Sequence, residues 1–348
     1  MKVLIHTGSG IGDMAQKLPM ARALKEEYPD AQIDFLMKGT GSSWNVNKNI
    51  IECQRYVRNL YWYNVANKIH CAKLLFQLML NHYDIGFVRD AGIMVDNSAP
   101  SYWICRIMRW SGCKKIVGLM PRGVDVFVEL PERTHYLERD RLTLKAIGID
   151  REMNANTIDI SLTDRSILSS VQTSRKIIAL SVGTNSYEWT KDGRTVIYDV
   201  KSWAYDKWLS LAPELVRHGH EVILLGGRKE LNEMHERNIN IPESEHIMNF
   251  IGRTSLKQSL ALLSASTLVV GSEGGMMHCA AAMGIKTLTL MGGSDYLQWR
   301  PAGGEIINLN YDCAPCFATS RASECDYHKC LENISVEMVL EKISGLEI

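Results

Sequence analysis

Three loops of small and polar residues each follow a short apolar run and precede a helical pattern. They are HTGSGIGD at 6–13, SVGTN at 181–185 and GSEGGMMH at 271–278. In such loops, glycines let a ligand approach the backbone, and the free N–H groups of a helix N-terminus attract an anion. Together the three loops predict ligand groups at the carboxyl ends of strands, in a cleft between two α/β halves.

The first loop does not predict a dinucleotide site. Its glycines are spaced GxGxG rather than GxGxxG, and the next strand pattern ends in Lys38 with no acid to bind a ribose. Asp13 stands at the start of the helical pattern, where the helix dipole stabilises a negative charge. From spacing alone, the favoured interpretation of Asp13 is an ordinary first-turn carboxylate.

The other two loops also allow a structural and a functional interpretation. Gly183 and the hydroxyl group of Thr184 suit the binding of a diphosphate, and they suit an ordinary turn equally well. Gly274 and Gly275 would present free N–H groups to a phosphate, and Glu273 would accept hydrogen bonds from sugar hydroxyls. The structural alternatives are a capping carboxylate for Glu273 and a hydrogen-bonded core histidine for His278. Each alternative is at least as good when its residue is taken singly.

The elements that must position these loops alternate regularly along the chain. Apolar runs of strand length alternate with longer helical patterns, and this rhythm predicts parallel sheets. A polar stretch at 163–176 separates two similar halves, which places a domain boundary near 168. Strands are expected at 2–6, 32–38, 83–90, 114–119, 176–183, 221–227, 267–273 and 286–293.

Length and composition exclude several classes of protein. The 348 residues, at ~150 per domain, suggest two domains. With 39 basic and 39 acidic residues, no net charge favours nucleic-acid binding, so no nucleic-acid partner is expected. The first residues do not resemble a signal peptide, and no apolar stretch approaches the length of a membrane span. Nine cysteines, five of them scattered among apolar residues, are typical of buried thiols in a reducing compartment, so a cytoplasmic protein is predicted.

Seven segments together resemble glycosyltransferase family 9, the ADP-heptose:lipopolysaccharide heptosyltransferase family, over nearly the whole chain. GSGIGDMAQKLPMARALKEEYPDAQIDFL resembles the family's opening, with its Gly-Asp at Gly12 and Asp13. YDIGFVRD resembles its third strand, and HYLERDRLTLKAIGI its domain-closing helix. SVGTNSYEW resembles the donor loop, and KSWAYDKWLSLAPELVRHGHEVILLGG the Lys-x-Trp helix and the strand after it. SEGGMMHCAAAMG resembles the Asp-Thr-Gly-x-Met-His loop, and GGSDYLQWRPAG the Gly-Pro-Thr-Asp…Trp-Arg-Pro segment.

The resemblance implies a GT-B fold, with two Rossmann-like domains whose parallel sheets face an interdomain cleft. Residues 1–168 would bind the acceptor and 169–333 the nucleotide sugar, and a C-terminal helix within 334–348 would pack back on the N-terminal domain. Asp13 would be the catalytic base. The resemblance assigns Ser9, Gly10 and Gly12 to the acceptor loop, and Thr184, Lys201, Glu273, Gly274, Gly275 and His278 to donor binding.

The activity that the resemblance implies is an inverting transfer of a heptose or similar sugar from an ADP-sugar to an anionic glycolipid of the lipopolysaccharide core. A carboxylate would take the proton of the acceptor hydroxyl, and Lys201 and helix N-termini would stabilise the charge on the leaving ADP. No cofactor is required for this chemistry. The enzyme would be cytoplasmic, with at most peripheral contact with the inner face of the membrane.

Two departures from the family pattern leave other functions open. Glu273 stands where the family usually has Asp, and Gly274 replaces a hydroxyl residue, which leaves the donor sugar open and admits a nucleotide-sugar-binding protein without turnover. A protein O-heptosyltransferase of the autotransporter-modifying type is the other alternative. The segment 187–200 is longer than the family's usual bridge. Its functional interpretations are a cover over the nucleotide or a surface for a partner, and the favoured interpretation is a surface hairpin.

Four cysteines near the C-terminal end have metal-ligand spacing. Cys313, Cys316, Cys325 and Cys330 form C-x2-C-x8-C-x4-C, and the first pair suits one tetrahedral zinc or iron ion. In the family's autotransporter-modifying branch a four-cysteine site resembling this one holds iron. With all four positions filled by sulfur the metal would be structural, and the alternative is four reduced thiols in a loop.

The segment 97–124 is basic and aromatic. It holds five basic residues and no acid, with Tyr102, Trp103 and Trp110 between them. Such a face suits an anionic acceptor or a membrane surface. The alternative, a solvated basic face over core residues, is favoured for most of its members.

Overall fold

The chain folds as two units, Met1–Leu162 and Thr163–Ile348. The computed structural model describes residues 1–88, 99–171, 173–184, 187–191, 194–198, 201–317, 322, 325 and 328–348. The division falls after Leu162, a few residues before the boundary that the sequence analysis expected at 168.

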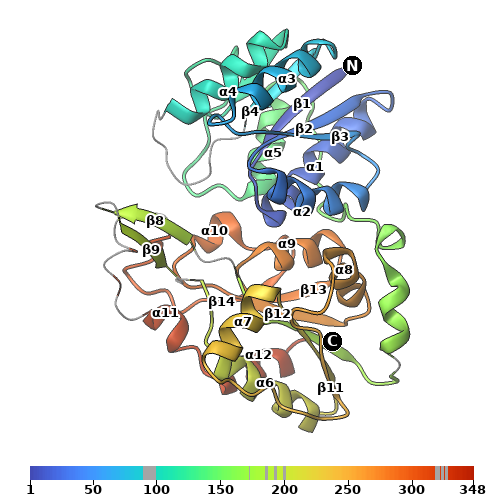
Figure 1. Cartoon of the computed structure of the whole chain (residues 1–348), viewed down its shortest axis with the longest axis vertical. Helices are drawn as coiled ribbons and strands as arrows, with labels where there is room; N and C mark the ends of the chain where they lie inside the picture. Colours follow the sequence, from blue (N-terminus) through green and yellow to red (C-terminus); the bar gives the residue numbers. More distant parts are fainter. Residues whose placement is uncertain are drawn as a thin grey trace. The chain divides into compact units, whose positions relative to one another are not determined.

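The N-terminal unit is built on a parallel sheet with the strand order β3-β2-β1-β4-β5-β6 (Figure 1). All five strand pairs are parallel, and this order is that of a doubly wound dinucleotide-binding fold. The strands are β1 Lys2–Thr7, β2 Gln32–Lys38, β3 Asn59–Tyr63, β4 Ile85–Val88, β5 Lys115–Gly118 and β6 Val126–Phe127.

Helices cover both faces of this sheet. Val3, Leu4 and Ile5 are fully buried although neighbouring side chains on a strand point to opposite faces, because each face has its own helices. Leu4 belongs to the core under α3 and α4, while α1 and α5 pack on one another. The helices are α1 Ile11–Glu27, α2 Gly41–Glu52, α3 Lys68–Met79, α4 Ala99–Trp110 and α5 Tyr136–Lys145.

The C-terminal unit repeats the same plan. Its sheet has the order β11-β10-β7-β12-β13-β14, again all parallel. The prediction of two Rossmann-like domains, each with a parallel sheet, is therefore confirmed. The strands are β7 Ile177–Ser181, β10 Glu221–Leu225, β11 Ile247–Asn249, β12 Leu268–Ser272, β13 Lys286–Leu290 and β14 Glu305–Ile307. The helices are α6 Tyr205–Arg217, α7 Arg228–Glu236, α8 Leu256–Ser264, α9 Gly275–Ala282, α10 Tyr296–Trp299, α11 Lys329–Glu332 and α12 Val336–Ser344.

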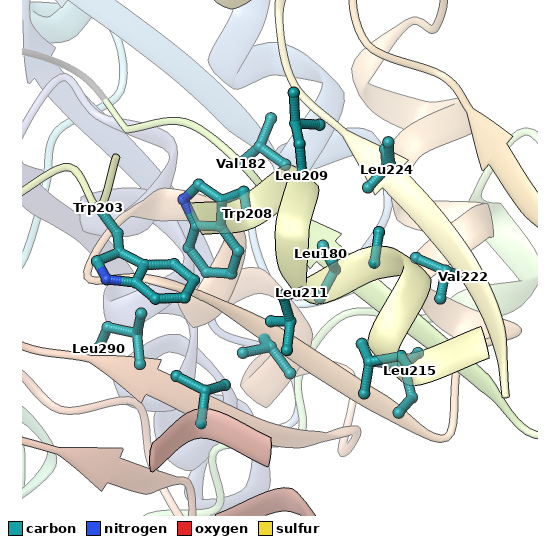
Figure 2. Packing of buried hydrophobic residues seen from close by; sticks show 14 of the residues in the cluster. Leu180, Val182, Trp203, Trp208, Leu209, Leu211, Leu215, Val222, Leu224 and Leu290 are labelled. Carbon is teal, nitrogen blue, oxygen red and sulfur yellow. The ribbon is translucent and has the colours of Figure 1, made fainter. Parts of the chain in front are cut away.

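Two tryptophans anchor the core of the C-terminal unit. Trp203 and Trp208 meet edge to face at 4.7 Å and 86°, and Figure 2 shows them beside Leu290 and the leucines of α6. Edge-to-face contact is a favoured geometry for aromatic pairs. The core therefore reaches from α6 to the segment just after Lys201.

The C-terminal helix does not pack where the sequence analysis expected it. Val339 and Ile343 of α12 are buried in the core of the C-terminal unit, against α6. Lys342 forms an ion pair of 2.7 Å with Glu305 of β14. The expectation that the helix within 334–348 packs back on the N-terminal domain is corrected, because its i, i+4 apolar pair fills the core beneath α6.

Several short strands were missed by the sequence analysis. The strands β3, β11 and β14 lie at sheet edges, and each has a partly exposed pattern. Tyr187–Lys191 (β8) and Arg194–Tyr198 (β9) pair antiparallel, as the hairpin alternative for 187–200 expected. Among the residues that the structure describes, no helix has the length and apolarity needed to cross a bilayer.

Candidate functional site

The loop between β1 and α1 is folded around the carboxylate of Asp13. The N–H of Gly10 donates to Asp13 Oδ2 at 3.1 Å, and Thr7 Oγ1 donates to the Asp13 carbonyl oxygen at 3.2 Å. Asp13 is half-buried in the first turn of α1. These contacts fix the direction of the carboxylate before any substrate binds.

Gly8 leaves the space that this carboxylate occupies. A Cβ on residue 8 would lie 2.3 Å from Asp13 Oδ2, and one on Gly10 would lie 3.1 Å from the same atom. The sequence analysis explained these glycines by the close approach of a ligand. The structure adds a nearer reason, since the protein's own carboxylate fills the place of the missing side chain.

The rest of this loop is anchored to α2. Asn47, 1% exposed, donates from Nδ2 to the carbonyl oxygen of Ser9 at 2.6 Å and to that of Ser43 at 2.9 Å. Gly10 is the N-cap of α1, and Gly12 is buried in its first turn. The structure therefore brings the four predicted residues of this loop together. Sequence analysis missed Asn47, which lies in a helical stretch that carries no motif.

A buried ion pair lies one helical turn beyond Asp13. Lys17 of α1 pairs with Asp140 of α5, and their side chains are 10% and 2% exposed. A buried charge is tolerated only when it is paired, so this contact ties α1 to α5. Nothing in the local sequence links two residues that are 123 positions apart.

In the C-terminal unit, Glu273 is the centre of a polar cluster at the end of β12. Its carboxylate forms an ion pair with Lys201 and accepts a hydrogen bond of 2.7 Å from Ser294 Oγ. His278 Nε2 lies 3.9 Å from the other carboxylate oxygen. Glu273 is only 7% exposed, so its charge depends on these partners.

The surroundings of Glu273 keep it ionised. Burial alone would raise the pKa of this carboxyl group, but the charges of Lys201 and His278 lower it, as do hydrogen bonds from Lys201 and Ser294. The partners outweigh burial, and the pKa lies below that of an ordinary glutamate. The cluster therefore carries a fixed carboxylate with a cation held against it.

The two glycines after Glu273 join this cluster to α9. Gly274 is the N-cap of α9 and Gly275 is its first residue, so free N–H groups begin at this point. Thr184 Oγ1 donates to the Glu273 carbonyl oxygen at 3.1 Å. A Cβ on Gly274 would lie 2.9 Å from the same hydroxyl oxygen, so the departure at Gly274 leaves room for Thr184.

Lys201 is positioned by its neighbours on two sides. The N–H of Trp203 donates to Ser272 Oγ at 3.1 Å, which fixes the backbone beside the end of β12. The ammonium group of Lys201 lies 3.8 Å from the ring centroid of Phe317, a cation–π distance. Sequence analysis missed Phe317 and Ser294, although Phe317 directly follows Cys316.

The four cysteines of the predicted metal site lie in the C-terminal unit with different exposures. Cys316 and Cys330 are buried, Cys325 is half-buried and Cys313 is exposed. Burial, followed by the neighbouring thiols, raises the pKa of Cys330 to about 11. Within the described ranges, however, no three His, Cys, Asp or Glu side chains are arranged to hold a metal ion. The thiols are near one another but do not form the predicted ligand set.

The structure thus gathers the predicted residues into one group in each unit. The C-terminal group offers an ammonium group and a helix N-terminus, which together suit a diphosphate. The N-terminal group offers an oriented carboxylate, which suits proton transfer. The C-terminal group comprises Thr184, Lys201, Glu273, Gly274, Gly275 and His278, and the N-terminal group comprises Ser9, Gly10, Gly12 and Asp13.

Known proteins resemble this chain over nearly its whole length. Lipopolysaccharide heptosyltransferase 2 of Salmonella typhimurium is 23% identical over 367 residues, which cover 99% of this chain and 98% of that protein. The structure of E. coli ADP-heptose lipopolysaccharide heptosyltransferase II matches with a TM-score of 0.67 at 19% identity, covering 99% of this chain and 98% of that one. TibC, an iron-containing dodecameric glycosyltransferase of enterotoxigenic E. coli, matches with a TM-score of 0.51 at 10% identity, covering 99% and 77%.

These structural likenesses agree with the GT-B class expected from the sequence. The family model of glycosyltransferase family 9 (heptosyltransferase) matches residues 112–326, which is more than half of the chain. The chain therefore belongs to glycosyltransferase family 9, the heptosyltransferase family, and is a glycosyltransferase.

Proposed function

We propose that this enzyme transfers heptose from an ADP-heptose donor to the core of a bacterial lipopolysaccharide, with inversion at the anomeric carbon. The polar cluster of Lys201, Glu273 and His278 at the N-terminus of α9 carries this proposal, because it suits a sugar diphosphate. The name of the Salmonella relative, which matches over nearly its full length, supports heptose and lipopolysaccharide as the substrates.

In the proposed reaction, Asp13 takes the proton of the acceptor hydroxyl. The hydroxyl oxygen then forms a bond to the anomeric carbon, and the bond from that carbon to the ADP oxygen breaks on the opposite face of the sugar. ADP leaves with the electron pair. Lys201 and the N–H groups of α9 stabilise its charge, and Glu273 holds Lys201 in place for this role.

The substitution Asp13→Asn tests the base. We expect transfer to fall by at least about a hundredfold, because general-base catalysis contributes 10²–10⁴-fold, while donor affinity stays the same. ADP release with ADP-heptose and a deacylated lipopolysaccharide core acceptor measures the rate, and calorimetry measures the affinity for ADP. Full activity of the variant would remove Asp13 from the mechanism. If the wild-type protein bound the donor but never released ADP, the nucleotide-sugar-binding alternative would hold instead.

A protein hydroxyl is the second candidate acceptor. It is favoured by the cysteine spacing, together with the likeness to TibC. A panel of acceptors that contains lipopolysaccharide cores and serine-rich protein domains separates the two by mass spectrometry. Modification of the protein domains alone would replace the glycolipid proposal.

A structural zinc or iron ion on Cys313, Cys316, Cys325 and Cys330 remains a proposal. TibC is iron-containing by its description, and in this chain Cys313, Cys316 and Cys325 lie near enough to Cys330 to raise the pKa of its thiol, after burial. The thiols do not form a ligand set in the described residues, so binding would have to draw them together. Metal analysis of protein purified under reducing, anaerobic conditions tests this. A content of zinc and iron below one metal ion per chain would contradict this proposal.

We also propose that the enzyme works in the cytoplasm, in peripheral contact with the inner face of the membrane. Cys53, Cys105, Cys113 and Cys279 are buried, which is typical of thiols in a reducing compartment. Fractionation of cells, followed by a salt wash of the membranes, tests this location.

A further inference from the structure

The outer side of α3 is covered with large apolar side chains. Ile69, Phe76, Met79 and Leu80 are 73%, 64%, 46% and 64% exposed. Their spacing puts them on one stripe along the helix and its last turn. The inner stripe, with Leu74 and Leu78, is already buried in the core of the unit. The outer stripe is therefore not needed to pack α3 on its own sheet.

The neighbouring helix α4 exposes two tryptophans of its own. Trp103 and Trp110 are 43% and 47% exposed, and the guanidinium carbon of Arg106 lies 4.7 Å from the centroid of each ring. Both helices pack on the same core, and Figure 1 shows them side by side. We name the outward side chains Ile69, Phe76, Met79, Leu80, Trp103 and Trp110 the α3–α4 surface.

The charge around the α3–α4 surface is positive. The sequence has no Asp or Glu at 64–83 or at 97–124. Lys68 and Lys73 are exposed on α3 itself. At the rim, two further cations are balanced, since Arg109 pairs with Asp125 and Lys114 pairs with Asp84. The apolar stripe is thus bordered by cations, and the acids at its rim are already paired.

This combination selects one kind of occupant. Large aliphatic side chains with tryptophan, arginine and lysine beside them are typical of helices that lie in the interface of an anionic bilayer. A two-fold contact between copies of the chain would set Lys68 and Lys73 against their own equivalents without acids to pair them. Charge complementarity therefore favours an anionic lipid surface over a second copy.

We propose that the α3–α4 surface docks the enzyme on a bilayer that contains anionic phospholipid. This inference rests on the proposed peripheral contact with the membrane and names the surface that makes it. The surface includes none of the residues proposed for the base or the donor, so its test is independent of the proposed reaction. Phe76, Leu80 and the tryptophan rings enter the interfacial region, and Lys68 and Lys73 lie among the phosphates.

Co-sedimentation of the full chain with vesicles tests the proposal without any sugar nucleotide or glycolipid acceptor. The vesicles are phosphatidylcholine, with or without roughly one third phosphatidylglycerol. We expect binding to the anionic vesicles that weakens as salt is added. The double variant Phe76→Gln, Leu80→Gln should bind at least about tenfold more weakly, because two apolar side chains no longer partition. The double variant Lys68→Gln, Lys73→Gln should lose roughly fivefold per charge on anionic vesicles only.

Met338→Gln on α12 is the matched control, because this methionine is also exposed, at 37%, but lies in the other unit. It should bind like the wild type. Thermal unfolding shows that each variant is folded, and Ile69→Gln replaces the double variant if that one is not. Wild-type binding that is absent, equal on both vesicle types, or unchanged in the apolar variants would overturn the proposal. So would a wild-type dimer that the apolar substitutions convert to a monomer, which would assign the surface to a second copy.

Discussion

At the scale of single residues, the two candidate groups hold their charges in place by different means. Asp13 is fixed by a backbone N–H and by the space left at Gly8. Glu273 is fixed by Lys201 and Ser294, which offset its burial. In both cases the protein orients the charged group through its own contacts, which is the preorganisation that transfer chemistry needs.

The lowered pKa of Glu273 makes stability depend on pH. The folded pKa is below the unfolded value of about 4.3, so the stabilisation is present above that value and is lost as pH falls towards the folded pKa. We expect Glu273→Gln to cost about 2 kcal/mol at pH 7, less than a fully buried pair, because Lys201 keeps 17% of its side chain exposed. Urea unfolding from pH 7 to pH 3 measures this. The gap between wild type and variant should narrow below about pH 4; a gap that is constant with pH would contradict the assignment.

Phe317 should act on the donor through Lys201. Its ring lies 3.8 Å from the ammonium group, so Phe317→Leu keeps an apolar cover but removes the π face. We expect the affinity for ADP to fall about threefold to tenfold, in line with a cation–π contact of about 1 kcal/mol. Calorimetry measures it, and Lys201→Ala gives the reference. In the Lys201→Ala background the Phe317 substitution should add nothing, whereas an equal additional loss would mean that the ring acts independently of Lys201.

At the scale of elements, the position of α1 depends on a contact that crosses the N-terminal unit. Lys17 and Asp140 are both buried, so the loss of one removes an opposite charge from beside the other at a place where water does not replace it. We expect Lys17→Met to cost about 3–5 kcal/mol in urea unfolding, and Lys17→Met with Asp140→Leu to recover part of this loss. Glu26→Gln is the control, because it breaks the pair with Arg22 at its exposed end and should cost only about 0.5 kcal/mol. Equal losses in the two single variants would show that the buried pair does not hold α1.

The sequence analysis identified those elements whose own residues carry a clear pattern. The run at Val3–Ile5 is apolar because both faces of β1 are covered, and such runs predict central strands. The strands β3 and β14 were missed because edge strands are short and mix polar with apolar residues. The loops were found from their glycines and polar residues, and their roles only from the family resemblance.

What the sequence analysis missed in the candidate site has one physical cause. Asn47 on Ser9, Asp140 on Lys17 and Phe317 on Lys201 are contacts between residues far apart in the chain. Propensity, periodicity and spacing describe neighbours along the sequence, and none of these quantities specifies such a pair. The prediction of where the C-terminal helix packs was wrong for the same reason. The apolar stripe of the helix shows that it is buried, but it does not show on which partner.

At the scale of the whole molecule, α12 shows which unit the end of the chain stabilises. Val339 and Ile343 are buried in the same core cluster as Leu215, so this helix belongs to the unit that holds the polar cluster around Glu273. The double variant Val339→Ala, Ile343→Ala should destabilise that unit by about 3–5 kcal/mol, because each truncation removes transfer free energy and leaves a cavity. Hydrogen exchange resolved by peptide should show faster exchange in β7, β10 and α6, and the affinity for ADP should fall.

The exchange of β1 and β2 decides between the two possible partners of the helix. If α12 stabilises only the unit it packs on, amides of Lys2–Thr7 and Gln32–Lys38 should keep their protection in the double variant. Glu341→Ala, on the exposed side of the same helix, should leave both units unchanged because it removes little buried surface. Faster exchange in β1 and β2 with normal protection in β7 would mean that the helix stabilises the N-terminal unit, as the family resemblance implied. Loss of protection in both sheets would instead mean that the two units unfold as one cooperative body, whichever of them α12 packs on.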